Sequence, residues 1–266
     1  YRMSLAVVFI FIYFLICKKS FKVDRIAIAK FFVTGILIAL HWIFFFKAIK
    51  VSNVSVALVT MSTGAFFVSL IEPLFFKRSI KVLELVLGFC VCIGLYIIFN
   101  FESQYRLGIF YALISSLLSA FFSVFNGLFI QKYDAGKISL YQLFFGVVFI
   151  TVYLLFTNGF SASFFEISKA DWGYLLILGS ICTAYAFITS VKVMKYLSPY
   201  TVILTLNLEP IYAIILALFI FGEEEKMNPE FYFGAFIVLF VVLLNGMIKN
   251  KNSIRNKIKE KSVSKN

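Results

Sequence analysis

A glutamate and an asparagine lie in the middle of an apolar stretch long enough to cross a membrane. Glu209 and Asn207 both fall within Tyr200–Phe221, whose other residues are mostly apolar. An ionised carboxylate near the centre of a bilayer is costly, so acidic residues there usually serve substrate or ion binding. Pro210 removes one helical hydrogen bond and frees the carbonyl of Leu206, so that a carboxylate, an amide and a bare carbonyl share one turn. We therefore predict that Glu209 and Asn207 bind or couple a substrate. The alternative is a protonated or capping Glu209 that serves packing alone.

A second set of polar residues follows a helical spacing. Ser116, Ser119, Ser123 and Asn126 lie three, four and three residues apart within Leu107–Ile130. This spacing places them on one face of a helix, which points inward if the opposite face meets lipid. Small polar residues also allow helices to pack closely, and for the serines this alternative is equally good. An asparagine exceeds what close packing requires, so we predict Asn126, with Ser123, as a cavity-lining group.

Aromatic and imidazole groups supply a third set of candidates. His41 and Trp42 lie in Phe31–Phe46, and Tyr185 falls in the corresponding region of Trp172–Val191. Histidine is rare in membrane spans, and a buried imidazole can bind substrate or relay a proton. A hydrogen-bonded structural histidine is the alternative, and Trp42 also suits the interfacial aromatic belt. We predict that all three side chains line a substrate site.

The composition identifies the structural class that must position these residues. The chain has 266 residues, of which 62% are hydrophobic and 14% are charged, and its mean hydropathy is +0.96. These values exclude a soluble domain, and apolar runs repeatedly approach the roughly 20 residues that a membrane-spanning helix needs. Helical lengths and internal Gly and Pro exclude a β-barrel. The nine predicted spans are Met3–Cys17, Phe31–Phe46, Val54–Phe76, Val82–Asn100, Leu107–Ile130, Leu140–Thr157, Trp172–Val191, Tyr200–Phe221 and Phe231–Ile248.

The distribution of charge predicts the topology. Assigning the loops alternately to two sides puts 19 of the 25 Lys and Arg on one side, which includes the C-terminal tail 249–266. The positive-inside rule places that side in the cytoplasm. The net charge of +12 is then explained by a basic face next to anionic lipid and requires no nucleic acid. We predict a multi-pass protein of the cell membrane with a cytoplasmic C-terminus.

Two stretches of the chain resemble each other. One begins at Ala39 and the other at Cys182, and each contains an apolar span, a short turn and a second apolar span with a Glu-Pro pair. Two repeated halves are a common plan of secondary transporters, in which substrate binds where the halves meet. We predict one repeat at 1–100, a second at 101–248, and a basic tail at 249–266.

The two predicted repeats differ in their number of spans. The second repeat supplies five spans and the first supplies four, and the chain begins with Tyr1 rather than Met. We therefore expect that one helix preceding Met3 is missing from a ten-helix plan. The alternative is that Met3 starts a nine-helix protein.

The Glu-Pro pair of the first repeat predicts a different role from that of the second. Glu72 lies only five residues before Lys77. At that depth a carboxylate reaches the interface and pairs with Lys77 or Arg78. We predict an interfacial Glu72 without a role in substrate binding.

At these residues the chain resembles a known family. The segments IFFFKAIKVSNVSVALVTMSTGAFFVSLIEPLFFKRS and LNLEPIYAIILALFIFGEE are similar to the paired signatures of EamA-type permeases of the drug/metabolite transporter superfamily. The resemblance covers nearly all of 1–248 and implies ten helices in two inverted five-helix repeats that move small metabolites, often outward. The chain departs from the pattern in its first helix and at Thr63-Gly64, where the first repeat usually has Thr-Pro.

The predicted protein is an all-α integral membrane protein with an inverted repeat of two five-helix bundles. We predict a secondary permease, an exporter of small metabolites such as amino acids, working by alternating access to a central cavity. A membrane-embedded enzyme and a non-transporting assembly or sensor subunit are the alternatives. The sequence contains no phosphate-binding loop and no cofactor motif. It also predicts no metal site, because Cys90 and Cys92 point in different directions on a helix. The predicted partners are a small-molecule substrate and the lipid bilayer, and a homodimer is left open.

Overall fold

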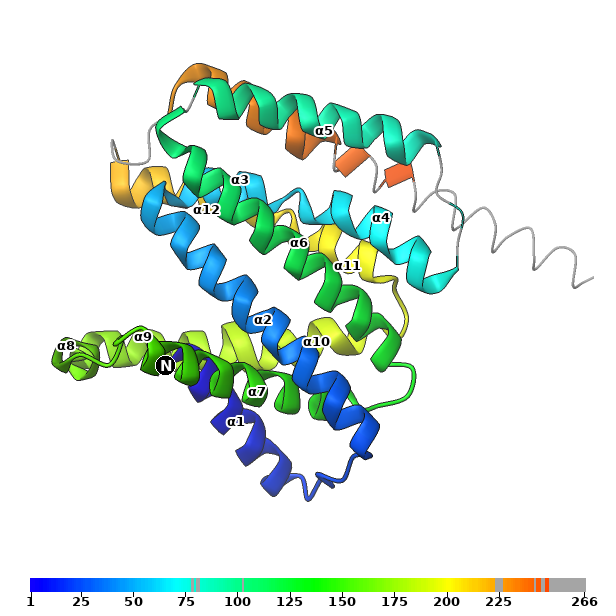
Figure 1. Cartoon of the computed structure of the whole chain (residues 1–266), viewed down its shortest axis with the longest axis vertical. Coiled ribbons are helices and arrows are strands. Elements are labelled where there is room, and N and C mark those ends of the chain that lie inside the picture. Colours follow the sequence, from blue (N-terminus) through cyan, green and yellow to red (C-terminus); the bar gives the residue numbers. More distant parts are fainter. Residues whose placement is uncertain are drawn as a thin grey trace, which may run out of the picture. The chain divides into compact units, whose positions relative to one another are not determined.

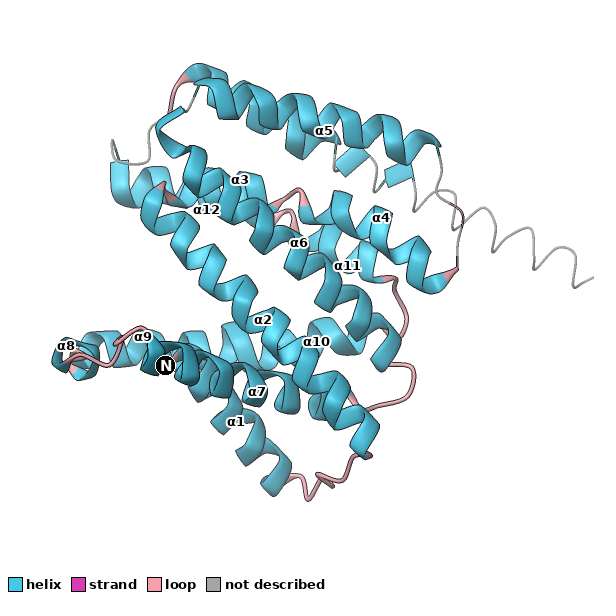
Figure 2. Ribbon diagram, viewed as in Figure 1, coloured by secondary structure: helices cyan, strands magenta, loops and turns pink. Residues whose placement is uncertain are grey.

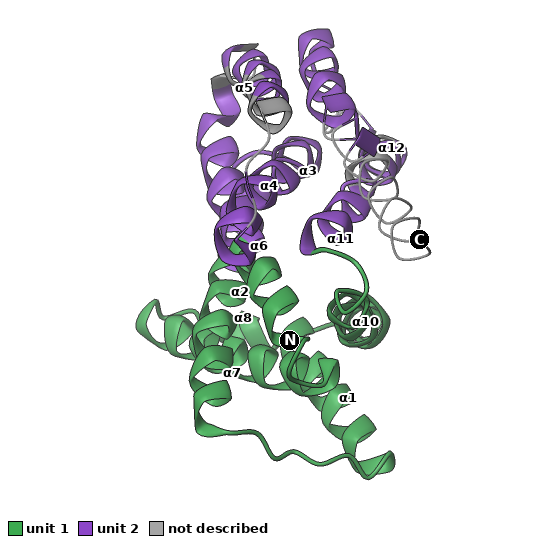
Figure 3. Ribbon diagram, turned by 90° about the vertical axis from the view of Figure 1, so that its right-hand side faces the viewer, with its two compact units in different colours: residues 1–42, 121–198 green, residues 43–120, 199–266 purple. Residues whose placement is uncertain are grey.

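The computed structural model describes residues 1–77, 79, 82–101, 103–222, 227–241, 243–244 and 247–248. Every regular element in these residues is a helix (Figure 2), which confirms the all-helical class predicted from composition. The chain divides into two compact units, drawn in different colours in Figure 3. Unit 1 comprises residues 1–42 and 121–198, and unit 2 comprises 43–120 and 199–266.

Five helical spans in the described residues are long and apolar enough to cross a membrane (Figure 1). They confirm the membrane-protein class. Two helices begin more than one turn before their predicted apolar spans: α2 at Arg25 and α7 at Ala135. The five spans are α2 (Arg25–Val51), Val54–Phe76, α6 (Arg106–Phe129), α7 (Ala135–Phe156) and Lys169–Val193.

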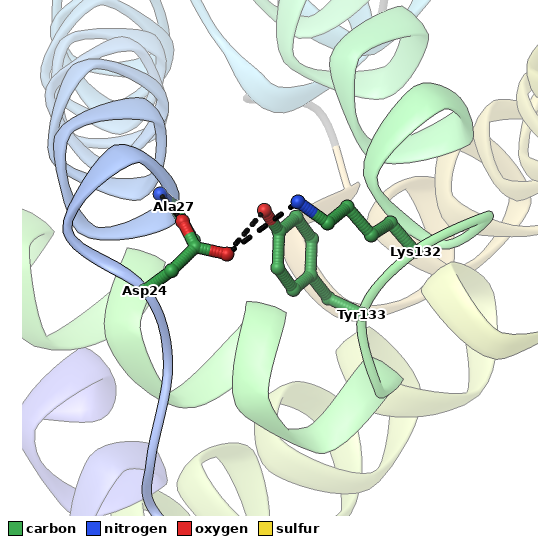
Figure 4. A network of polar contacts seen from close by, with 4 residues as sticks. All are labelled: Asp24, Ala27, Lys132 and Tyr133. Atoms are coloured by element: carbon green, nitrogen blue, oxygen red, sulfur yellow. Dashed lines mark hydrogen bonds and ion pairs between the residues drawn. The ribbon is translucent and has the colours of Figure 1, made fainter.

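Aspartate N-caps explain why these two helices start early. Asp24 accepts a hydrogen bond of 2.7 Å from the backbone N–H of Ala27, and the Tyr133 hydroxyl donates to the same carboxylate at 2.9 Å (Figure 4). Asp134 accepts from the N–H groups of Gly136 and Lys137 at the start of α7. Each cap satisfies helix N–H groups that otherwise lack a partner, so the helix extends into polar sequence.

Unit 1 is built around α1 (Arg2–Ile16). One face of this helix, with apolar residues three, four and four apart, packs against α7, α9 (Lys169–Gly179) and the π-helix η2 (Ser180–Tyr185), which continues into α10 (Ala186–Val193). A short helix, α8 (Ala162–Phe165), precedes α9. The buried core cluster is Met3, Ala6, Ile10, Phe14, Ile38, Leu140, Leu143 and Ala184.

Unit 2 contains two helix pairs that are each interrupted in the middle of a span. The first is α3 (Val54–Met61) and α4 (Gly64–Phe76), and the second is α11 (Pro199–Leu206) and α12 (Glu209–Phe221). In described contacts α3 packs on α12 and α4 packs on α11. The two spans therefore lie side by side along both of their halves.

The two interruptions have different chemical causes. In the second span Pro210 lacks an N–H and cannot donate the helical hydrogen bond to the carbonyl of Leu206, where α11 ends. In the first span no proline is present at the break, and side-chain hydroxyls there bond to backbone carbonyls. Ser62 Oγ donates to the carbonyl of Val59 at 2.6 Å, and Thr63 Oγ1 donates to that of Thr60 at 2.7 Å. Such local bonds compete with the helical ladder.

Glycines allow a close approach of two further helices in unit 2. A Cβ placed on Gly94 of α5 (Val82–Phe101) would lie 3.0 Å from the carbonyl oxygen of Gly234, and one on Gly234 would lie 2.9 Å from that of Gly94. Gly234 belongs to the helix Pro229–Val241. A short 3₁₀ turn (Ser103–Tyr105) connects α5 to α6. Gly94 and Gly234 thus bring the backbones of α5 and the helix Pro229–Val241 close together.

Candidate functional site

Asn207 lies at the interruption between α11 and α12 and reaches the interruption of the other span. Its side chain is buried, and Nδ2 donates a hydrogen bond of 2.7 Å to the backbone carbonyl of Ser62. In an uninterrupted helix that carbonyl would bond within its own ladder, so the break leaves it in need of a donor. The amide of Asn207 supplies this donor and joins the two broken spans.

Further polar groups gather at the same place. The hydroxyls of Thr63 and Ser116 lie 3.0 Å apart, and Ser116 Oγ also donates to the carbonyl of Met61 at 3.1 Å. Ser62, Thr63, Ser116 and Asn207 are all buried, and together with Thr60 we call them the break cluster. The hydroxyl of Thr60 is buried and, within the described part of the chain, has no hydrogen-bond partner. The break cluster thus contains buried polar groups beyond those that pair with one another.

Glu209 is the first residue of α12, and its side chain is exposed on unit 2. A carboxylate in the first turn of a helix is favoured by the partial positive charge of the free N–H groups there. The position two residues after Asn207 puts the carboxylate on the same short connection as the break cluster. The Glu209 carboxylate thus stabilises the start of α12 and is also accessible to a ligand.

Glu72 has a different environment from the one expected from the sequence. Its side chain is only 1% exposed, and Oε2 accepts a hydrogen bond of 3.0 Å from the backbone N–H of Tyr200. That N–H belongs to the first turn of α11, where it has no acceptor within its own helix. Glu72 thus caps a neighbouring helix from inside unit 2. The predicted pairing with Arg78 lies outside the described residues.

Unit 1 contains a separate cluster of buried side-chain amides. Gln142 Nε2 donates to the hydroxyl of Thr34 at 2.8 Å and to Oδ1 of Asn126 at 2.7 Å. All three side chains are at most 1% exposed. The carbonyl oxygen Oε1 of Gln142 is buried and has no hydrogen-bond partner among the residues that the structure describes. We call Thr34, Asn126 and Gln142 the amide cluster; it joins α2, α6 and α7 and retains an acceptor that is free to bind a donor.

A guanidinium group lies against the π-helix of unit 1. Arg2 Nε donates to the hydroxyl of Thr183 at 2.7 Å, and the guanidinium carbon lies 4.8 Å from the ring centroid of Trp42. Thr183 Oγ1 in turn donates to the carbonyl of Leu178 five residues earlier. Single π-helical turns within α-helices are frequent at functional sites. The Trp42 ring is thus the aromatic partner of Arg2 in a cation–π contact.

The other candidates predicted from the sequence take separate positions in unit 1. The His41 ring meets Phe122 edge to face, with 5.5 Å between the ring centroids. Ser123 is buried on the same face of α6 as Asn126, whereas Tyr185, the last residue of the π-helix, is 68% exposed. The predicted residues are divided between the two units. Asn207 and Glu209 belong to unit 2, and Asn126, His41, Trp42, Tyr185 and Ser123 belong to unit 1.

Three of the polar residues that the structure brings forward were not predicted. Gln142 lies only two residues after the start of its predicted span, where an amide would face the membrane interface. In the structure α7 begins at Ala135, so that Gln142 lies about two turns after the start of the helix. Thr34 and Arg2 gave no sequence signal beyond their polarity. The available cue is Asp134, because an N-cap residue there starts the helix before the apolar run and makes Gln142 an interior position.

A family model identifies the chain. The model of the EamA-like transporter family matches residues 1–100 and 106–247. The chain belongs to this family. An uncharacterized transporter of Clostridium kluyveri is 25% identical to this EamA-like chain over an alignment of 214 residues, which covers 77% of the chain and 66% of that relative. The match thus spans slightly less than two thirds of the relative's length.

A solved crystal structure is also similar to this EamA-like protein. The two chains are 14% identical, the TM-score is 0.66, and the match covers 94% of this chain and 86% of the other. At this identity the likeness concerns the fold alone. Family and helices together make the protein a multi-pass membrane protein of a transporter family.

Proposed function

We propose that this EamA-like protein is a secondary permease that exports small polar or amphipathic metabolites, such as amino acids, across the cell membrane. The proposal includes an inverted repeat of two halves, with the C-terminal tail in the cytoplasm. Its main support is the pair of interrupted spans joined by the hydrogen bond from Asn207 to the Ser62 carbonyl. Interrupted helices are a recurring way for transporters to expose backbone and polar side chains to a substrate.

The proposed mechanism is alternating exposure of a central cavity to the two sides. In this proposal Glu209 binds a cationic group of the substrate or carries a coupling ion, because its carboxylate is exposed beside the break cluster. Asn126, with the unpartnered carbonyl of Gln142 close by, contributes amide groups that can bind the polar part of a substrate. Both clusters carry the acceptors that an amino acid's ammonium group requires.

The experiment is flux in proteoliposomes that contain the purified full-length protein and a mixture of labelled amino acids. Imposed proton and substrate gradients should drive movement of chemically unchanged solute. Gradient-independent conversion of the solute would instead support an enzyme. The absence of driven flux for every metabolite in a broad labelled set would contradict the permease proposal.

Glu209→Gln tests the role assigned to the carboxylate. The substitution keeps size and hydrogen-bonding capacity and removes the negative charge, so transport should be abolished or uncoupled while expression and membrane insertion stay normal. Glu230→Gln is a matched control, since Glu230 is also an exposed first-turn carboxylate next to a proline in unit 2. Equal flux in both variants and the wild type would assign Glu209 to helix capping alone.

A further inference from the structure

A cavity of about 220 Å³ opens in unit 1 at the ends of several helices. It lies next to the last turn of α1, the start of α7 and the turn that follows α10. Its lining includes three lysines, Lys19, Lys192 and Lys195, and one carboxylate, Asp134. All three lysines belong to the basic side of the topology, the side expected to face the cytoplasm. The cavity is therefore rich in positive charge.

The single carboxylate does not neutralise the cavity. Asp134 Oδ1 is used by the backbone, since it accepts from the N–H groups of Gly136 and Lys137. In the part of the chain that the structure describes, no ion pair joins Lys19, Lys192 or Lys195 to a carboxylate. Asp134 therefore offsets only part of the positive charge of the three lysines, and the cavity keeps an excess of positive charge that favours an anion.

A neighbouring lysine, Lys132, forms an ion pair with a carboxylate. Lys132 Nζ lies 3.5 Å from Asp24 Oδ2, and the same oxygen accepts the hydroxyl of Tyr133 (Figure 4). Lys132 does not line the cavity, although Tyr133 does. Lys132 thus has a carboxylate partner in Asp24, whereas the three cavity lysines have no such ion pair in the described residues.

Lys19 is held in position by aromatic rings. Its Nζ lies 4.9 Å from the ring centroid of Tyr13 and 5.7 Å from that of Phe14. The contact with the Tyr13 side chain is the largest cause that raises the pKa of Lys19 above its usual value, and the nearby Asp134 carboxylate adds to it. The two ring contacts restrict the position of the Lys19 ammonium group, which lowers the entropic cost of binding an anion.

Size and surroundings restrict the ligand. The volume is below the roughly 300–1,000 Å³ of pockets that enclose drug-sized ligands, so the cavity accommodates a headgroup rather than a nucleotide. Large apolar side chains are exposed beside it along the chain, at Ile12, Leu15 and Ile16 on α1 and at Tyr196 and Leu197 after α10. A ligand with an anionic head and an apolar body would contact both kinds of surface.

We propose that this cavity binds the phosphate-bearing headgroup of an anionic phospholipid. Basic pockets between membrane helices on the cytoplasmic side suit such headgroups, and here the lysines surround a cavity instead of being spread over a surface. The three ammonium groups and the hydroxyl of Tyr13 supply donors to the phosphate oxygens. The proposal concerns a lipid site and does not depend on the transported substrate.

Two triple variants with the same change in charge test the proposal. One replaces the cavity lysines (Lys19→Gln, Lys192→Gln, Lys195→Gln). The other replaces Lys18, Lys22 and Lys30 by Gln, which are exposed on the same basic side and do not line the cavity. Each purified protein in neutral detergent is titrated with phosphatidylglycerol, phosphatidylcholine, glycerol 3-phosphate or inorganic phosphate, and bound molecules are counted by native mass spectrometry.

We expect wild type and the surface variant to bind phosphatidylglycerol with similar affinity and the cavity variant to bind it at least about tenfold more weakly. Equal weakening in both triple variants would overturn the proposal in favour of a general surface potential. Lysine-dependent binding of glycerol 3-phosphate or inorganic phosphate without phosphatidylglycerol would overturn it in favour of a soluble phosphate ligand. Equal binding of phosphatidylcholine would do so too.

A second variant covers the case in which the triple variant does not fold. Lys192→Gln with Lys195→Gln leaves the contact between Lys19 and Tyr13 intact and changes only exposed side chains. Its affinity for phosphatidylglycerol should fall about threefold or more, with an unchanged thermal midpoint in the absence of lipid. Wild-type affinity in this folded double variant would contradict the proposal.

Discussion

The side-chain amide of Asn207 donates a 2.7 Å hydrogen bond to the backbone carbonyl of Ser62, 145 residues earlier in the chain. The donor and the acceptor each belong to the interruption of a membrane-length span. The Ser62 carbonyl at the break in the first span thus accepts a hydrogen bond from Asn207 at the break in the second span. The interruption at Ser62 thus depends on Asn207 for a hydrogen-bond donor.

Asn207→Ala should destabilise the protein, because it leaves the buried Ser62 carbonyl without a donor. The expected loss is about 1–3 kcal/mol of unfolding free energy, measured by thermal or denaturant unfolding in detergent. Asn100→Ala is the matched control. Its amide donates to the carbonyl of Tyr96 on an exposed surface, and we expect a change within about 0.5 kcal/mol. Similar stability of both variants would show that the Ser62 carbonyl finds another partner.

The amide cluster allows stability and function to be separated. Gln142→Leu removes the donor to Thr34 and Asn126 and leaves buried acceptors unsatisfied, so it should cost about 1–3 kcal/mol. The triple variant Thr34→Val, Asn126→Leu, Gln142→Leu removes all partners together and should recover most of that loss. If the cluster binds substrate, the triple variant remains inactive in flux measurements despite its recovered stability. Recovery of both properties would assign the cluster to packing.

Gly35 permits the close approach of α2 and α7. A Cβ at this position would lie 2.6 Å from the backbone oxygen of Gln142 and 2.9 Å from Cβ of Phe145. Gly35→Ala should therefore separate the helices and lower the free energy of unfolding by about 1–3 kcal/mol. Gly173→Ala in α9 meets nothing within 4 Å and should be neutral or stabilising by up to about 1 kcal/mol. Midpoints of thermal unfolding that rank these variants the other way would contradict the packing of α2 on α7.

Asp24 links the stability of unit 1 to pH. The N–H of Ala27, followed by the Tyr133 hydroxyl and Lys132, lowers the pKa of Asp24 below its usual value of 3.8. A lowered pKa in the folded state means that the carboxylate stabilises the fold above pH 3.8 and that this contribution is lost as the pH falls through the folded-state pKa. Asp24→Asn keeps the N-cap and removes the charge. Its thermal midpoint should be below that of wild type at neutral pH, and the difference should shrink as the pH falls below 3.8. A constant difference across this range would exclude the charge as the cause.

Hydropathy predicted the class and most span positions because bilayer length is a strong constraint on apolar runs. It could not predict where helices extend beyond those runs. The N-caps Asp24 and Asp134 each start a helix before its apolar span, and this is why Gln142 lies in the interior. The interruption at Pro210 follows from proline chemistry, whereas the one at Ser62 and Thr63 depends on hydroxyl groups that also occur within regular helices.

Long-range pairing explains the remaining differences. Glu72 looked interfacial because Lys77 is near in sequence, but the first turn of α11 supplies a donor at Tyr200. Asn207 was predicted from its neighbours in one turn, and its partner Ser62 comes from a distant span. Contacts over such separations depend on how spans pack, which residue patterns within one span do not specify.

The π-helix Ser180–Tyr185 makes one membrane span tolerant of a change in length. A π-turn contains one residue more than an α-turn, so the segment amounts to an insertion between α9 and α10. Deleting Ile181 would let it relax into an α-helix while the flanking helices keep their orientations. The same deletion within α10 would rotate every later residue of that helix by about 100°. This span therefore has a place where evolution can remove a residue without turning the helix that follows.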